Sequence, residues 1–144
     1  MLSETELLKV ACSVWTNFLG VTAVPTTVEN APSGDLVTGV VRFHGDWNGG
    51  LALTMKKQHA RDLAAAVFMV EASEVSDEDY TDLIGELANI FAGNVKALAV
   101  GSSTLNLPQV HVGEFTDLQL VEGGQPLLKA VLRSLDESVL IRAF

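Results

Sequence analysis

The clearest hydrophobic pattern in the chain lies between Ser76 and Val100, where apolar residues recur at helical spacing. Ser76 and Asp79 match the capping box that begins a helix, and Gly101 is placed to end it. The pattern therefore predicts one long helix over residues 76–100. We expect its apolar stripe to face a core; the stripe consists of Tyr80, Leu83, Ile84, Leu87, Phe91, Val95 and Leu98.

A second, polar stripe follows the same predicted helix and consists of Asp82, Glu86, Asn89, Gly93 and Lys96. These positions advance by alternate steps of four and three residues, so their side chains stack on one exposed face. Gly93 is unusual there, because a glycine within a helix costs roughly 0.8–1.0 kcal/mol relative to alanine. We interpret it as a gap that lets another surface come close to the helix beside Asn89.

Shorter patterns on either side predict two further helices and several strands. Ser3 and Glu6 match another capping box, which begins an apolar helix that ends at Gly20, and residues 56–70 match a third helix. The turn-rich residues 21–34 are expected to run over the surface as a strand or loop, and residues 101–108 as a loop. The other strands are expected at 35–44 and 51–55 as one hairpin, at 109–113, at 118–121, and at 126–135 and 137–144 as a second hairpin.

This order of elements predicts an α+β fold with a mainly antiparallel sheet and helices packed on one face. A chain of 144 residues that is 48% hydrophobic is large enough for one continuous core. We therefore expect one domain over residues 1–144.

The charge balance excludes some classes of partner. A net charge of −9 without any run of Lys or Arg argues against nucleic acid or an anionic membrane surface. No apolar run approaches the roughly 20 residues of a membrane span, and the first residues lack the basic region of a signal peptide. A cytoplasmic protein that meets other proteins through local patches is the expectation.

The cysteine and histidine residues do not form the patterns of a metal site or a reactive thiol. Cys12 is the only cysteine and falls on the apolar side of the first helix, so we expect a buried structural thiol and no disulfide. His44, His59 and His111 fall on different elements without the spacing of a metal site. No metal site is therefore predicted.

The polar stripe carries a resemblance to a known family. The string Asp82-x-x-x-Glu86-x-x-Asn89, continued as Gly93, Asn94 and Lys96 and followed later by Pro108, resembles the signature of the CheC/CheX/FliY family. These proteins are phosphatases that dephosphorylate the chemotaxis response regulator CheY. The resemblance implies a phosphorylated, CheY-like receiver domain as substrate and partner. It also implies the predicted fold and, for CheX members, a homodimer built by joining sheets.

The expected substrate is an aspartyl phosphate, whose carboxylate leaves with little acid assistance. The receiver is expected to bring its own Mg²⁺ and a lysine, so this chain needs no cofactor. An amide can place a water in line with the phosphorus, and we assign that role to Asn89. Glu86 either accepts from water or binds the receiver's lysine, and the resemblance favours the lysine. Asp82, Gly93 and Lys96 are assigned to contact with the receiver.

The first helix faintly repeats this pattern. Asn17 to Gly20 echoes Asn89 to Gly93, and Val14 stands where the glutamate would be. If the echo is an internal repeat, its first copy lacks the acid and the chain has one active site, as in CheX members.

Two other functions compete with the phosphatase. In one, the same helix binds a receiver without accelerating hydrolysis. In the other, the chain is a small-molecule-binding or structural dimer domain. Burial of the stripe around Glu86 in a subunit interface would favour this second function.

Overall fold

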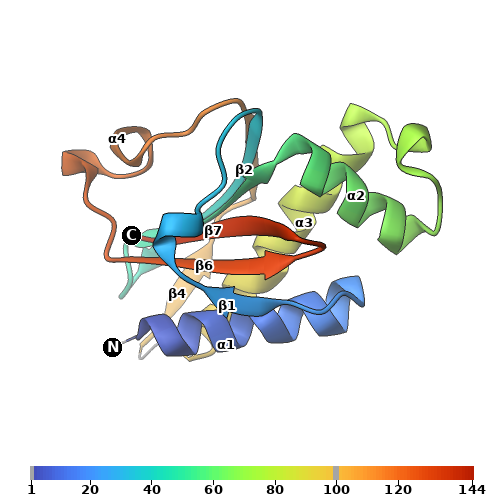
Figure 1. Ribbon diagram of the computed structural model, residues 1–144. Helices are drawn as coiled ribbons and strands as arrows, with labels where there is room; N and C mark the ends of the chain where they lie inside the picture. The colour runs from blue at the N-terminus through green and yellow to red at the C-terminus, as the bar shows by residue number, and fades with distance from the viewer. Residues whose placement is uncertain (1, 99–100) are drawn as a thin grey trace.

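One antiparallel sheet forms the centre of the fold (Figure 1). The computed structural model describes residues 2–98 and 101–144. Within that part of the chain, seven strands are joined in the order β1-β6-β7-β3-β2-β4, and β5 also pairs with β2. The strands are β1 (Val24–Thr26), β2 (Leu36–Gly45), β3 (Gly49–Lys56), β4 (Ser103–Leu105), β5 (Gln109–Val112), β6 (Leu128–Ser134) and β7 (Glu137–Ala143).

Two hairpins make up the middle of the sheet. In the first, β2 and β3 pair with Val41 opposite Leu51. In the second, β6 and β7 are joined at Leu135 and Asp136, whose φ angles of 50° and 61° fit a tight two-residue turn between twisted strands. Because β3 pairs with β7, the two hairpins form one continuous surface.

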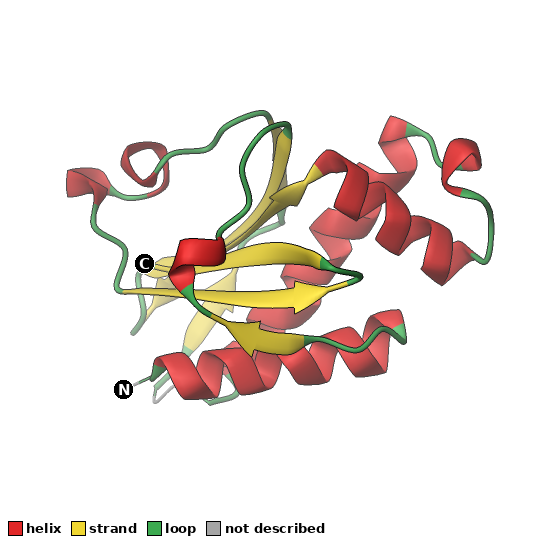
Figure 2. Ribbon diagram, viewed as in Figure 1, coloured by secondary structure: helices red, strands yellow, loops and turns green. Residues whose placement is uncertain are grey.

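Three helices pack on one face of this surface (Figure 2). Their apolar stripes join alternate residues of the strands in one core, which includes Trp15, Phe43, Leu53, Phe91 and Ile141. The helices are α1 (Glu4–Val14), which continues as the π-helical turn η1 (Trp15–Leu19), α2 (Lys57–Phe68) and α3 (Asp77–Lys96); the short turns are η2 (Val28–Asn30), η3 (Ala72–Glu74) and η4 (Glu122–Gly124).

The short helix α4 (Asp117–Leu120) covers part of the opposite face. Leu120 packs there with Val40, Ala52 and Phe144 in a second, smaller cluster. A capping box made by Thr116 and Gln119 begins this helix. The three long helices therefore cover one face of the sheet, and α4 covers part of the other.

Asp117 ties α4 to the sheet through two cations. Nη1 of Arg142 donates a hydrogen bond to Asp117 at 3.0 Å, and Lys129 pairs with the other carboxylate oxygen. Burial raises the pKa of Asp117, but the hydrogen bonds and charges of Lys129 and Arg142 outweigh it and hold the pKa below its usual range. Arg142 is only 2% exposed, and its Nη2 donates to Thr54 at 3.0 Å.

The structure confirms the predicted α+β fold, both hairpins, the capping boxes at Ser3 and Ser76, and the helix predicted at residues 56–70. It corrects the prediction of a strand at 118–121, where helix α4 ends, and of a loop at 101–108, which contains β4. Helix α3 ends at Lys96, and the predicted positions 99 and 100 lie outside the described residues. Leu98 is 52% exposed, contrary to its predicted place in the core, because Val95 is the last residue of the stripe with a core to meet.

No helix in the described ranges is both long enough and apolar enough to cross a membrane.

Candidate functional site

Helix α3 presents its polar stripe to solvent because its apolar stripe is fixed against the core. Ser76 caps the helix, with its Oγ accepting from the Asp79 backbone at 3.0 Å while Asp79 accepts from the Ser76 backbone at 3.0 Å. Leu87 and Phe91 are fully buried on the inner side. All five residues of the predicted stripe are exposed: Asp82, Glu86, Asn89, Gly93 and Lys96.

Glu86 and Asn89 lie one helical turn apart on this face. Among the residues that the structure describes, no side-chain hydrogen bond or ion pair engages either of them. Asn94 differs, because its Nδ2 donates to the carbonyl oxygen of Ile90 at 2.8 Å. The exposed Asn94 side chain is thus bound to the backbone of its own helix. The carboxylate of Glu86 and the amide of Asn89 remain available to an external partner.

Two glycines flank Asn89 on the helix, one turn before it and one turn after. A Cβ placed on Gly93 would meet nothing within 4 Å, so the surface beyond Asn89 is open. A Cβ placed on Gly85 would lie 3.4 Å from Cγ2 of Val110 and 4.0 Å from Cγ of Pro108. The sheet edge therefore lies close against the helix on this side, and Pro108 is beside Gly85, one turn from Asn89.

The charges along α3 are unevenly distributed. Three acidic residues occupy the first turn, where the helix dipole favours them, and Lys96 lies in the last turn. Asp77 pairs with Arg61 at 2.7 Å, and the guanidinium lies 5.3 Å from the centre of the Tyr80 ring. The polar stripe thus carries two carboxylates, Asp82 and Glu86, at one end and an ammonium group at the other.

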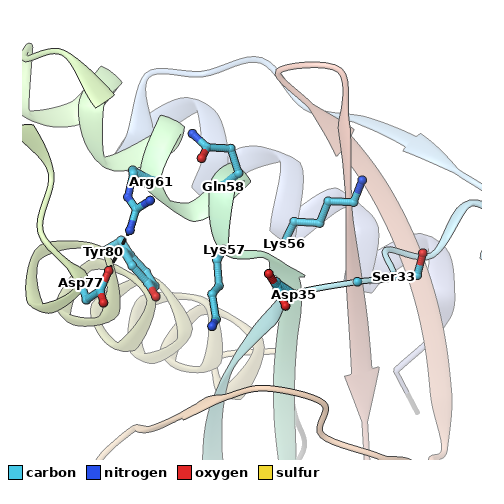
Figure 3. A pocket seen from close by; sticks show the side chains of 9 residues that line it. Ser33, Asp35, Lys56, Lys57, Gln58, Arg61, Asp77 and Tyr80 are labelled. Carbon is cyan, nitrogen blue, oxygen red and sulfur yellow. Dashed lines mark hydrogen bonds and ion pairs between the residues drawn. The ribbon is translucent and has the colours of Figure 1, made fainter. Parts of the chain in front are cut away.

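A hollow of about 530 Å³ adjoins the first turn of α3 (Figure 3). Lys56, Lys57 and Arg61 line it together with Asp35 and Asp77, and the side chains drawn there point in different directions. No residue of the polar stripe lines this hollow. The candidate site is therefore an exposed helix face rather than a cleft, which suits a macromolecular partner better than a small ligand.

The echo on the first helix does not form a second copy of the site. Val14 is buried, and Asn17 is exposed, with its Nδ2 donating to Oγ of Ser13 at 3.2 Å. Asn17 lines a hollow of about 210 Å³ between α1 and α3, and Asn94 lies on its other side. The described residues lining this hollow include no carboxylate.

The histidines and the cysteine lie apart from the stripe. His59 is buried, and its Nε2 lies 2.9 Å from Oγ of Ser134, which also accepts a hydrogen bond from Trp15. Burial lowers the pKa of His59, and it raises the pKa of Cys12, which is only partly buried rather than fully so as predicted. Within residues 2–98 and 101–144, no group of three His, Cys, Asp or Glu side chains is placed to hold a metal ion.

The pattern of residues 76–100 predicts the polar stripe, but it does not predict the close contact at Gly85. The available signal was a second glycine inside the helix, four residues before Asn89. Nor could sequence reasoning place Pro108 beside this glycine, because that contact depends on how β5 pairs with β2.

The family profile described as chemotaxis phosphatase CheX matches residues 37–129 of this chain. The fold is similar to that of the chemotaxis protein CheX from Vibrio vulnificus, with a TM-score of 0.75, 16% identity, and 99% of this chain and 98% of that chain covered. It is also similar to a CheC-like superfamily protein from Shewanella sp. PV-4, with a TM-score of 0.74, 19% identity, and 99% and 97% covered.

A third similar structure is the CheX-CheY-BeF₃-Mg²⁺ complex from Borrelia burgdorferi, with a TM-score of 0.66, 18% identity, and 99% and 97% covered. No curated protein has a sequence that matches this chain. The profile spans well over half of the chain and includes the whole of helix α3 and the adjoining sheet edge. The chain therefore belongs to the CheX family of chemotaxis phosphatases.

Proposed function

We propose that this chain hydrolyses the aspartyl phosphate of a CheY-like receiver domain and so ends a chemotactic or related two-component signal. The observation that carries the proposal is the exposed pair on α3, in which Glu86 and Asn89 lie one turn apart and are free of intramolecular partners among the described residues. The similar complex from Borrelia burgdorferi joins a CheX to a CheY, which supports a receiver as the partner here.

In the proposed reaction, a water molecule attacks the phosphorus of the acyl phosphate. The bond between phosphorus and the aspartyl oxygen breaks, which releases the free carboxylate and inorganic phosphate, and the phosphate keeps both protons of the water. Because a carboxylate is a good leaving group, the protein has mainly to orient the water. The Asn89 amide offers an acceptor and two donors in fixed directions for this purpose.

Glu86 would dock the receiver rather than take the proton. It lies on the same face as Asn89, within reach of a protein that covers both, and a carboxylate pairs well with the lysine expected on the receiver. Any Mg²⁺ would enter with the substrate. Asp82, Gly93 and Lys96 extend the contact along the helix, with Gly93 providing the close approach.

A homodimer formed through the sheet is part of the proposal. The sheet has two edges, β1 on one side and β4 with β5 on the other. β1 is only three residues long and contains Pro25, which cannot donate a ladder hydrogen bond. Light scattering of the purified protein should give twice the chain mass, and a monomer at all concentrations would reject this part.

Release of inorganic phosphate tests the function directly. A CheY-type receiver is phosphorylated with acetyl phosphate, freed of the donor, and incubated with and without this protein. We expect the protein to accelerate release, and Glu86→Gln to raise KM more than it lowers kcat. Binding of the phosphorylated receiver without acceleration would instead support a non-catalytic binding module.

A further inference from the structure

Leu107 is an exposed apolar side chain at the edge of the candidate site. It is 87% exposed, whereas half of the leucines of the chain are buried in the two cores. It lies between β4 and β5, where the edge of the sheet is interrupted for three residues. A single exposed leucine is common on protein surfaces, so the argument depends on where Leu107 lies.

The segment around Leu107 is fixed rather than loose. The backbone N–H of Asn106 donates to the carbonyl of Arg42 at 2.9 Å, and its Nδ2 lies 2.8 Å from Nε2 of His44. On the other side, Pro108 lies against Gly85 of α3. Because both neighbours are anchored, Leu107 is presented in one place and loses little backbone entropy on contact.

The position of this segment brings Leu107 close to the face of α3 that carries Glu86 and Asn89. Gly85 precedes Asn89 by four residues, which is about 6 Å along the helix axis. Pro108 packs on that glycine, and Leu107 is the residue before it. A protein interface of standard size covers about 800 Å² on each partner, a patch of roughly 16 Å radius. A receiver centred on Glu86 and Asn89 would therefore reach this edge.

The charge of the stripe makes an apolar contact useful. Asp82 and Glu86 are carboxylates that must approach a negatively charged phosphoryl group, and the chain carries a net charge of −9. Burial of one leucine side chain contributes affinity that does not depend on charge or salt.

From this placement we propose that Leu107 is the apolar anchor of the receiver-docking surface and determines affinity for the phosphorylated receiver without taking part in hydrolysis. The inference rests on the proposed function, since it needs a receiver at the Glu86 and Asn89 pair. Its occupant is the same receiver, and the surface is continuous with that pair through Pro108 and Gly85.

Steady-state dephosphorylation of a CheY-type receiver tests the proposal. We expect Leu107→Ala to raise KM about 10- to 100-fold with kcat within twofold of the wild type. Leu107→Met should restore most of the affinity, and Leu107→Asp should weaken binding further. The matched control is Leu127→Ala, because Leu127 is 72% exposed but lies in the segment between α4 and β6; we expect it to leave KM unchanged.

Three outcomes overturn the anchor role. A KM unchanged by both Leu107→Ala and Leu107→Asp would show that the receiver does not cover this residue. Loss of a wild-type dimer in light scattering of either variant would show that a second copy of this chain covers it. A drop in kcat with KM unchanged would place Leu107 in the reaction rather than in docking. Failure of the proposed function is distinguishable, because the wild-type protein would then not accelerate phosphate release above the spontaneous rate. In that case, titration of the beryllofluoride-activated receiver against wild type and Leu107→Ala decides the anchor role by itself.

Discussion

Replacing Gly93 by alanine should stabilise the protein and weaken it as a partner for the receiver. The glycine is helical and exposed, and an added Cβ would meet nothing within 4 Å. The substitution therefore gains the difference in helix propensity without strain, about 0.8–1.0 kcal/mol. For a chain of this size, that gain corresponds to a rise of about 2–4 °C in Tm.

The same methyl group should obstruct a partner that packs against the helix beside Asn89. Overpacking a close contact by one or a few carbon atoms costs about 1–3 kcal/mol, which predicts a rise in KM of about 5- to 150-fold. Gly93→Gln keeps good helix propensity and adds a longer side chain, so we expect a similar Tm and a larger KM.

Thermal unfolding followed by circular dichroism and steady-state phosphate release give the two quantities on the same samples. The matched control is Asn94→Ala, because Asn94 neighbours Gly93 in sequence but its side chain bonds back to Ile90. We expect this control to retain wild-type KM. A more stable Gly93→Ala with wild-type KM would refute the reasoning that a partner packs against this glycine. A less stable Gly93→Ala would show that the space around Gly93 is not open.

Three further predictions concern stability. Gly39→Ala should cost about 1–3 kcal/mol in urea unfolding, because its Cβ would lie 3.0 Å from Cγ2 of Ile84 where the sheet meets α3, and an unchanged midpoint would contradict this. Burial lowers the pKa of His59, so the unfolded chain takes up a proton near pH 6.5 that the folded protein does not. The free energy of unfolding should therefore be full above about pH 6.5 and fall below it. If it still falls with pH in His59→Gln, another group is responsible. Asp117→Ala should cost about 2–3 kcal/mol by chemical denaturation, because it leaves the buried guanidinium of Arg142 without its carboxylate; a loss under 0.5 kcal/mol would mean that Arg142 finds another partner.

Local signals in the sequence predicted where the main elements begin. Ser3 and Ser76 cap their helices as their capping boxes indicate, and the alternation in β6 and β7 gave the correct hairpin. The end of α3 was predicted too late, because Gly101 marks a turn but the helix ends once Val95 has made its last core contact. The local pattern could not supply that information, since it depends on the extent of the sheet beneath the helix.

Other misses have different physical causes. The short helix α4 carried a legible capping box at Thr116 and Gln119, which apolar alternation in the next residues obscured. Strand β4 has few apolar residues, and it forms because β2 offers an unpaired edge. For the site, the spacing on α3 was sufficient to put Glu86 and Asn89 on one exposed face. The contact of Pro108 with Gly85 required the tertiary structure.

Turnover at saturating receiver concentration, compared between Asn89→Ala and Asn17→Ala, tests the central claim most directly. Both variants remove an exposed amide from a helix, and only Asn89 has a carboxylate one turn away on the same face. We predict that Asn89→Ala lowers kcat by about 100-fold or more with little change in KM, whereas Asn17→Ala keeps kcat within twofold. Wild-type kcat in Asn89→Ala would contradict the assignment of water positioning to this amide.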